Sequence, residues 1–207
     1  TWWNERRVRA EGKDVRVIHL HPSSHAGYYP GAAQLHMKMI VDAESDAILG
    51  AQIVGEEGVD KRIDVIATAM RAGLSATDLA DLELAYAPQF GSAKDPINFA
   101  GFINDNIARG EKTVQWHELD ERLASGALLV DVRSPEEFAS GAIPGAVNIP
   151  LDELRVRHEE IADHDDVIVH CQVGLRGHNA ARLLTNLGYD VANLDGGYLT
   201  WTNGQED

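Results

Sequence analysis

One cysteine, Cys171, lies where an apolar run ends and a short glycine-containing loop begins. The loop joins the run at residues 167–170 to a segment of helical periodicity and reads Cys171-Gln172-Val173-Gly174-Leu175-Arg176-Gly177. We therefore expect a strand, a tight loop and the start of a helix. Loop N–H groups, the positive end of the helix dipole and the charge of Arg176 favour an anionic sulfur over a thiol. Cys171 is thus predicted to be a nucleophile at neutral pH, on condition that solvent reaches it.

The chain has no second cysteine, which limits its redox chemistry. An intrachain disulfide and a two-cysteine metal site are excluded, and a lone thiol is typical of a reducing compartment, so we expect a cytoplasmic protein. Any group loaded on Cys171 must leave to an external nucleophile or to another chain. His19, His21 and His25 are close in sequence, but no carboxylate or thiol stands at ligand spacing with them. We predict no metal site and expect these histidines at the surface or at a dimer contact.

Strands and helices alternate from Glu111 to the end of the chain. The predicted strands are residues 127–132, 147–149, 167–170 and 189–194. The first and third are continuous apolar runs, as expected for strands buried on both faces of a parallel sheet. Ser134, followed three residues later by Glu137, predicts a helix that starts with a capping box. Residues 111–207 are therefore predicted to form an α/β domain with a mainly parallel sheet, whose strand ends are a common place for ligands.

The first half of the chain has a different order, with strands first and helices after. The predicted strands are residues 15–20, 35–41 and 48–54. Three helices are expected to follow: one that ends at Gly73, a short one from Ser75 to Leu82, and one that begins at Asp95-Pro96. This order predicts an α+β domain with an antiparallel sheet and helices, extending over residues 1–110.

The bulk composition excludes two classes of partner. The net charge is -15, and it is divided unevenly: -4 for residues 1–110 and -11 for residues 111–207. Such an acidic chain is unsuited to binding duplex nucleic acid, which requires a basic surface. No apolar run approaches the roughly 20 residues of a membrane-spanning helix. We therefore expect neither a nucleic acid nor a membrane as partner.

The second domain resembles the rhodanese family of sulfurtransferases in segments that follow one another in the family's order. These segments are Leu129-Val130-Asp131-Val132-Arg133, Glu137-Phe138, Gly141-Ala142-Ile143-Pro144-Gly145-Ala146, Asn148-Ile149-Pro150, the cysteine loop, and Leu194-Asp195-Gly196-Gly197 with Trp201. Together they span nearly all of residues 112–203. The resemblance implies a rhodanese-like fold and the transfer of sulfane sulfur through a persulfide on the cysteine.

The same resemblance assigns roles to individual residues. It implies that Cys171 is the catalytic nucleophile, that Arg176 orients an anionic donor, and that the substrate-binding loop consists of Gln172, Val173, Gly174, Leu175 and Gly177. Asp131 and Arg133 are expected to tie a strand to neighbouring loops rather than to touch substrate. Cysteine phosphatases are an alternative, but they place five residues between cysteine and arginine, whereas four stand here. The shorter loop favours a sulfur atom over a phosphate.

Residues 23–107 resemble the C-terminal dimerisation domain of the flavin-dependent pyridine nucleotide-disulfide oxidoreductases, in the coenzyme A disulfide reductase branch. The matching stretches are His25-Ala26-Gly27-Tyr28-Tyr29-Pro30-Gly31, Ile48-Leu49-Gly50-Ala51-Gln52, Gly58-Val59-Asp60-Lys61-Arg62-Ile63-Asp64, Ala85-Tyr86-Ala87-Pro88 and Ala93-Lys94-Asp95-Pro96. The resemblance implies a homodimer. In that family two tyrosines reach the partner subunit's active site, and they match Tyr28 and Tyr86. A phenol near a reacting thiol stabilises a leaving thiolate or anchors coenzyme A.

Dinucleotide-binding fingerprints are absent, because no G-x-G-x-x-G follows any predicted strand, and the flavin-proximal cysteine of the reductase branch is missing. We expect this chain to bind no cofactor by itself. The domain order resembles the C-terminal part of fused coenzyme A disulfide reductase-rhodanese enzymes. That resemblance implies FAD, NAD(P)H and coenzyme A for a longer protein, and thiosulfate, polysulfide or coenzyme A persulfide as sulfur substrates. The start at Thr1, without an initiator Met, fits this expectation. The alternative that stays open is a non-catalytic module that dimerises and binds a thiol ligand.

Overall fold

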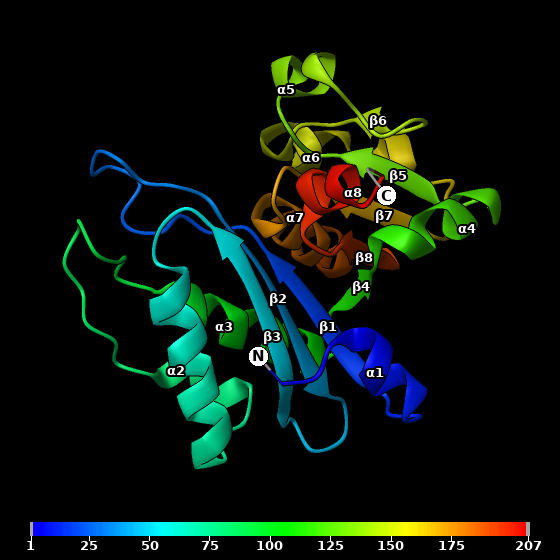
Figure 1. Cartoon of the computed structure of the whole chain (residues 1–207). Helices are drawn as coiled ribbons and strands as arrows, with labels where there is room; N and C mark the ends of the chain where they lie inside the picture. Colours follow the sequence, from blue (N-terminus) through cyan, green and yellow to red (C-terminus); the bar gives the residue numbers. More distant parts are fainter. Residues whose placement is uncertain (1, 206–207) are drawn as a thin grey trace. The chain divides into compact units, whose positions relative to one another are not determined.

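The computed structural model describes residues 2–205, and the chain divides into two compact units, residues 1–110 and 111–207 (Figure 1). The elements of the first unit are α1 (Glu5–Ala10), β1 (Val15–Leu20), β2 (Leu35–Asp42), β3 (Ile48–Gly55), α2 (Val59–Ala72), the 3₁₀ helix η1 (Thr77–Asp81) and α3 (Pro96–Ala108). The strands form an antiparallel sheet in the order β1-β2-β3. The predicted α+β class with an antiparallel sheet is confirmed.

Alternation along the strands produces the core of this unit. Ile18 pairs with Met39 across β1 and β2, and Met39 pairs with Ala51 across β2 and β3, so the three side chains share one face of the sheet. That face is buried against α2 and α3, which contribute Ile66 and Ile97. The segment predicted as a helix from Ser75 is instead a 3₁₀ helix of five residues. It packs against α3.

The second unit is an α/β domain. Its elements are β4 (Lys112–Val114), the 3₁₀ helix η2 (Trp116–Glu118), α4 (Leu119–Ala124), β5 (Leu128–Asp131), α5 (Pro135–Ser140), β6 (Val147–Asn148), α6 (Leu151–Arg157), the 3₁₀ helix η3 (His158–Ile161), β7 (Val167–His170), α7 (Leu175–Asn186), β8 (Val191–Leu194) and α8 (Gly197–Gly204). The strands lie in the order β4-β8-β7-β5-β6, and every neighbouring pair is parallel. The predicted parallel α/β class is confirmed.

Both faces of this sheet are covered, which explains the continuous apolar runs in β5 and β7. Val130 and Val169 belong to a cluster with Leu184 of α7, whereas Leu129 and Ile168 belong to a cluster with Leu119 of α4. Adjacent residues of one strand point to opposite faces, so each strand contributes to both clusters. The hydrophobic pattern of the sequence did not predict α1, β4, α6 or α8.

The capping box predicted for α5 is present. Ser134 Oγ accepts the N–H of Glu137, and the Glu137 carboxylate accepts the N–H of Ser134. Among residues 2–205, the helices lack the combination of length and apolar composition that crossing a bilayer demands.

Candidate functional site

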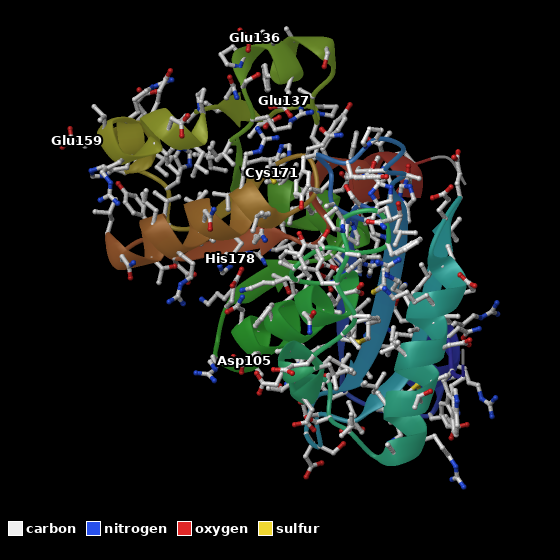
Figure 2. The ribbon with its side chains drawn as sticks, turned by 90° about the vertical axis from the view of Figure 1, so that its left-hand side faces the viewer. Asp105, Glu136, Glu137, Glu159, Cys171 and His178 are labelled. Atoms are coloured by element: carbon white, nitrogen blue, oxygen red, sulfur yellow. The ribbon has the colours of Figure 1, made fainter. Side chains whose placement is uncertain are left out.

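The cysteine loop lies at the carboxyl end of the sheet's middle strand. β7 ends at His170, Cys171 follows, and α7 begins at Leu175 (Figure 2). The Cys171 Sγ accepts a hydrogen bond from the N–H of Gly174 at 3.2 Å. Gly174 has a φ of 104°, in the region that favours glycine, so the tight loop depends on this residue type. A main-chain donor aimed at sulfur stabilises negative charge there.

Neighbouring elements hold the loop carbonyls. At the start of α8, the N–H groups of Tyr198 and Leu199 donate to the carbonyls of Cys171 and Gln172, at 2.8 and 3.0 Å. The approach is so close that a Cβ on Gly197 would stand 2.5 Å from the Cys171 carbonyl oxygen. Asn193 of β8 donates from Nδ2 to the Gly174 carbonyl at 3.3 Å. These bonds hold the loop carbonyls, and the Gly174 N–H faces the sulfur.

Arg176 lies next to the sulfur but is paired with a carboxylate. Its Nη1 and Nη2 donate to the two carboxylate oxygens of Glu137, each at 2.7 Å. The Glu137 carboxylate raises the pKa of Arg176, and the neighbouring Cys171 adds to this effect. Conversely, the Arg176 guanidinium lowers the pKa of Glu137 to about 2. Sequence reasoning assigned Glu137 to the helix cap alone and missed this pairing.

The sulfur is enclosed. Cys171 is 1% exposed, whereas Leu175 in the same loop is 60% exposed. The Arg176–Glu137 pair is more open, with side-chain exposures of 38% and 35%. The sequence predicts a reactive cysteine only if solvent reaches its sulfur. In this structure Cys171 is almost completely buried. An external molecule would reach the sulfur only after groups around the loop move, and both Leu175 and the ion pair are partly exposed there.

Asp131 and Arg133 are buried beneath the loop and connect it to the rest of the unit. The Arg133 guanidinium donates to both carboxylate oxygens of Asp131, at 2.7–3.0 Å. Its Nη1 donates to Gln172 Oε1 at 3.0 Å, and its Nη2 donates to the Gly141 carbonyl at 2.7 Å. The guanidinium also lies over the Tyr198 ring, 4.2 Å from the centroid. These contacts support a scaffolding role, in which Arg133 positions the residue next to Cys171.

His170 immediately precedes the cysteine and is fully buried. It stacks on Tyr198, and its Nε2 lies 3.5 Å from the Asp131 carboxylate. Burial lowers the pKa of His170, although Asp131 opposes the shift. Within residues 2–205, Nε2 has no hydrogen-bond partner. This environment favours a neutral, packed His170, which agrees with a structural role.

In the first unit, Tyr28 and Tyr86 lie together at the surface. Their hydroxyl groups are 2.7 Å apart, and the side chains are 75% and 50% exposed. This hydrogen bond raises the pKa of Tyr28. The two loops that carry them are joined because the N–H of Ala26 lies 3.3 and 3.1 Å from the carbonyls of Pro88 and Gly91. The structure thus brings together two residues that the sequence separates by 58 positions.

A buried arginine fixes the same two loops. Arg62 of α2 is 1% exposed and pairs with Asp95 at 2.9 Å. Its Nη2 also donates to the Ser24 carbonyl at 2.7 Å. Ser24 lies in the loop of Tyr28, and Asp95 ends the loop of Tyr86. For Arg62, on a helix of mixed charge, the sequence favours a solvated position or an ion pair; the ion pair is present, and the burial was not predicted.

The histidines near β1 lie in different environments. Within the part of the chain that the structure describes, no group of three or more His, Cys, Asp or Glu side chains is suited to hold a metal ion. His21 Nδ1 lies 2.9 Å from His36 Nδ1, and burial lowers the pKa of His21 to about 4. His25 is buried and its Nδ1 contacts the Ala26 carbonyl, so of the two positions expected from the sequence, surface or dimer contact, the surface position is wrong for this residue.

Comparison with known domain families divides the chain in two. Residues 3–95 match the pyridine nucleotide-disulphide oxidoreductase dimerisation domain. Residues 115–204 match the rhodanese-like domain. Among curated proteins, the chain is 43% identical over 89 residues to a coenzyme A disulfide reductase of Staphylococcus aureus (strain bovine RF122 / ET3-1), and 40% identical over 89 residues to that of Staphylococcus haemolyticus. Each match covers 43% of this chain and 20% of the relative.

Two solved structures resemble both units together. Reduced Bacillus anthracis CoADR-RHD is 49% identical with a TM-score of 0.94, and an NAD-dependent persulfide reductase from A. fulgidus is 36% identical with a TM-score of 0.87. Each match covers 97% of this chain and 36% of the other, so the chain spans about a third of the length of these relatives. The chain therefore consists of a pyridine nucleotide-disulphide oxidoreductase dimerisation domain followed by a rhodanese-like domain, matching the C-terminal part of these two proteins.

Proposed function

We propose that the rhodanese-like domain transfers sulfane sulfur through a persulfide on Cys171. The Cys171 thiolate attacks the outer sulfur of a donor and forms a new S–S bond. The bond between that sulfur and the donor breaks, and its electron pair leaves with the donor as a thiolate or, from thiosulfate, as sulfite. The persulfide is then attacked by an acceptor thiolate, which regenerates the Cys171 thiolate.

The observation that carries this proposal is the environment of Sγ. The Gly174 N–H is bonded to the sulfur, and the Arg176 guanidinium stands beside it. Both groups stabilise an anionic sulfur, first on the thiolate and then on the persulfide. Gln172, Val173, Leu175 and Gly177 are the remaining residues of the proposed substrate-binding loop, and Arg133, paired with Asp131, holds Gln172 by a hydrogen bond.

Mass spectrometry tests the proposal. After incubation with thiosulfate, polysulfide or coenzyme A persulfide, the peptide containing Cys171 should gain the mass of one sulfur atom. The gain should disappear on addition of cyanide, with release of thiocyanate. The Cys171→Ser variant should show neither result. Hydrolysis of phosphate esters without any sulfur gain would instead support the phosphatase alternative.

A non-catalytic, thiol-binding module is the second candidate, and the 1% exposure of Cys171 is the observation that favours it. Alkylation separates the two candidates. A sulfur that becomes accessible as the loop moves should react with iodoacetamide in the folded protein, and thiosulfate should protect it. A module with a permanently sealed cysteine should react only after unfolding.

We further propose that the first unit forms a homodimer within a longer FAD- and NAD(P)H-dependent reductase of coenzyme A disulfide, persulfide or polysulfide. The relatives that match this unit support it. Tyr28 and Tyr86, exposed and hydrogen-bonded to each other, would then contact the substrate thiol in the partner subunit. Among the described residues 2–205, no G-x-G-x-x-G follows a strand, and the loop after β7 carries Cys171 instead. FAD and NAD(P)H would therefore bind outside this chain.

Three tests bear on the assembly. Sedimentation equilibrium of the purified chain should give the mass of a dimer, and an exclusively monomeric chain would contradict the proposal. The reading frame upstream should encode two G-x-G-x-x-G units with a cysteine close after the first. The purified chain alone should not oxidise NADH in the presence of coenzyme A disulfide.

A further inference from the structure

The anion-binding groups around the cysteine loop are already occupied by carboxylates of the protein itself. Residues 171–177 contain a single cation, Arg176. Both of its terminal nitrogens donate to Glu137, and this bidentate geometry is the one that guanidinium groups also use for external oxyanions. The other guanidinium near the loop, that of Arg133, is paired in the same way with Asp131.

Glu137 is held firmly in this position. It is the third residue of α5, and its Oε2 accepts the N–H of Ser134 at 2.9 Å while also accepting from Arg176. The Arg176 guanidinium lowers its pKa to about 2, so the carboxylate stays ionised at neutral pH. Glu136, next to it, is exposed and carries the same charge. Figure 2 shows Glu137 nearer to Cys171 than Glu136 is.

The charge of the site follows from these contacts. A donor that approaches Arg176 meets a cation whose charge is matched by Glu137, in a domain whose residues 111–207 carry a formal charge of -11. A dianion must either displace the Glu137 carboxylate or lie beside it, and both cost free energy. A donor with one negative charge meets a smaller penalty.

We propose that Glu137 is a specificity-determining residue, which disfavours dianionic sulfur donors such as thiosulfate and selects donors with at most one charge near the sulfane sulfur, such as organic persulfides and thiosulfonates. This inference rests on the proposed sulfur transfer by Cys171. The bond changes are the same for both classes of donor. Thiosulfate releases sulfite, an organic thiosulfonate releases a sulfinate, and a persulfide releases a thiolate, each with the electron pair of the broken S–S bond.

Two donors of matched shape isolate the effect of charge. Thiosulfate and the methanethiosulfonate ion carry the same reacting sulfur, and a methyl group of the second replaces one anionic oxygen of the first. We would measure kcat/KM for both, with cyanide as acceptor, in the wild type, Glu137→Gln and Glu136→Gln. Glutamine at position 137 can still close the capping box with Ser134, and thermal unfolding would verify that the variant is folded.

The wild type should prefer methanethiosulfonate. Glu137→Gln should reduce that preference by about fivefold, the order expected for one partly exposed charge pair, chiefly by a gain with thiosulfate. Glu136→Gln removes the same charge from the same helix without touching Arg176 and should change the preference less than twofold. Equal changes in the two variants, or no change in Glu137→Gln, would overturn the inference about Glu137. The proposed function would still stand if a persulfide forms on Cys171 in these experiments. Failure of both donors to load Cys171 would overturn both.

Discussion

The two units each present a group suited to sulfur chemistry, but in opposite environments. In the second unit, Cys171 is enclosed, and its loop is held by hydrogen bonds from residues of the same unit. In the first unit, Tyr28 and Tyr86 are exposed and contact mainly each other through their hydroxyls. An enclosed nucleophile is tuned by its own chain, whereas exposed phenols need a partner surface to act on. On the proposed function, the cysteine site would draw its groups from this unit, and the tyrosine pair would act together with a partner subunit.

A buried arginine supports each site, and the two arginines do so through the same kinds of hydrogen bond. Arg133 ties the residue after Cys171 to β5 through Asp131, and Arg62 ties together the loops of Tyr28 and Tyr86 through Asp95. Each arginine is satisfied by a carboxylate and by main-chain or amide oxygens. Charges that are buried and fully hydrogen-bonded define one geometry, because moving either partner leaves the other unpaired.

The largest expected effect is the loss of sulfur transfer in Cys171→Ser. Serine has nearly the same size but is not ionised at neutral pH, so no persulfide can form. Transfer to cyanide should become undetectable, while the sedimentation mass and the titration of the tyrosines stay unchanged. Residual transfer in this variant would show that the enclosed cysteine is not the reacting group.

The next effect concerns stability. Asp131→Ala leaves Arg133 buried without its carboxylate, which should lower the free energy of unfolding of the second unit by about 3–5 kcal/mol. Asp166→Ala breaks the pair with Arg122, whose two side chains are 40% and 41% exposed, and should cost less than about 1 kcal/mol. Urea unfolding followed by the fluorescence of Trp116 and Trp201, with the other tryptophans replaced by Phe, measures both. Similar costs for the two variants would refute a supporting role for the buried pair.

A smaller effect depends on pH. Arg176 lowers the pKa of Glu137 from 4.5 to about 2, so the ionised carboxylate stabilises the fold above about pH 4.5, and this contribution is lost as the pH falls through about 2. Glu137→Gln should therefore be less stable than the wild type at pH 7. The difference should narrow between pH 4.5 and 2. Glu159→Gln, at an exposed position in the same unit, serves as the control, and a constant difference for Glu137→Gln across this range would contradict the prediction.

The smallest effect is expected at the tyrosine pair. The hydrogen bond between Tyr28 and Tyr86 raises the pKa of Tyr28. Tyr86→Phe should therefore lower the pKa of Tyr28 toward the ordinary value of 10.0. Ultraviolet titration of phenolate absorbance measures the change. Tyr29→Phe removes a neighbouring hydroxyl outside the pair and should leave Tyr28 unchanged. An unaltered titration in Tyr86→Phe would mean that the pair is not formed in solution.

Short-range patterns predicted much of the fold. The alternation in β2, the apolar runs of β5 and β7, and the Ser134–Glu137 capping box all depend on neighbours within a few residues, and all are confirmed. The weak elements were missed for the same reason. β4 has three residues and α8 begins at Gly197, directly after Gly196, so neither shows a clear period, and both are held by contacts with distant segments.

The sequence by itself determined the residue types at the site: one sulfur, a glycine that permits the tight loop, and one arginine after four intervening residues. Only the tertiary structure decided that the sulfur is enclosed and that Arg176 is paired with Glu137, 39 positions away. It likewise decided that Arg62 is buried and that the two tyrosine hydroxyls meet. The physical reason is that backbone periodicity and capping act over one or two turns, whereas burial and ion pairing depend on how distant segments pack.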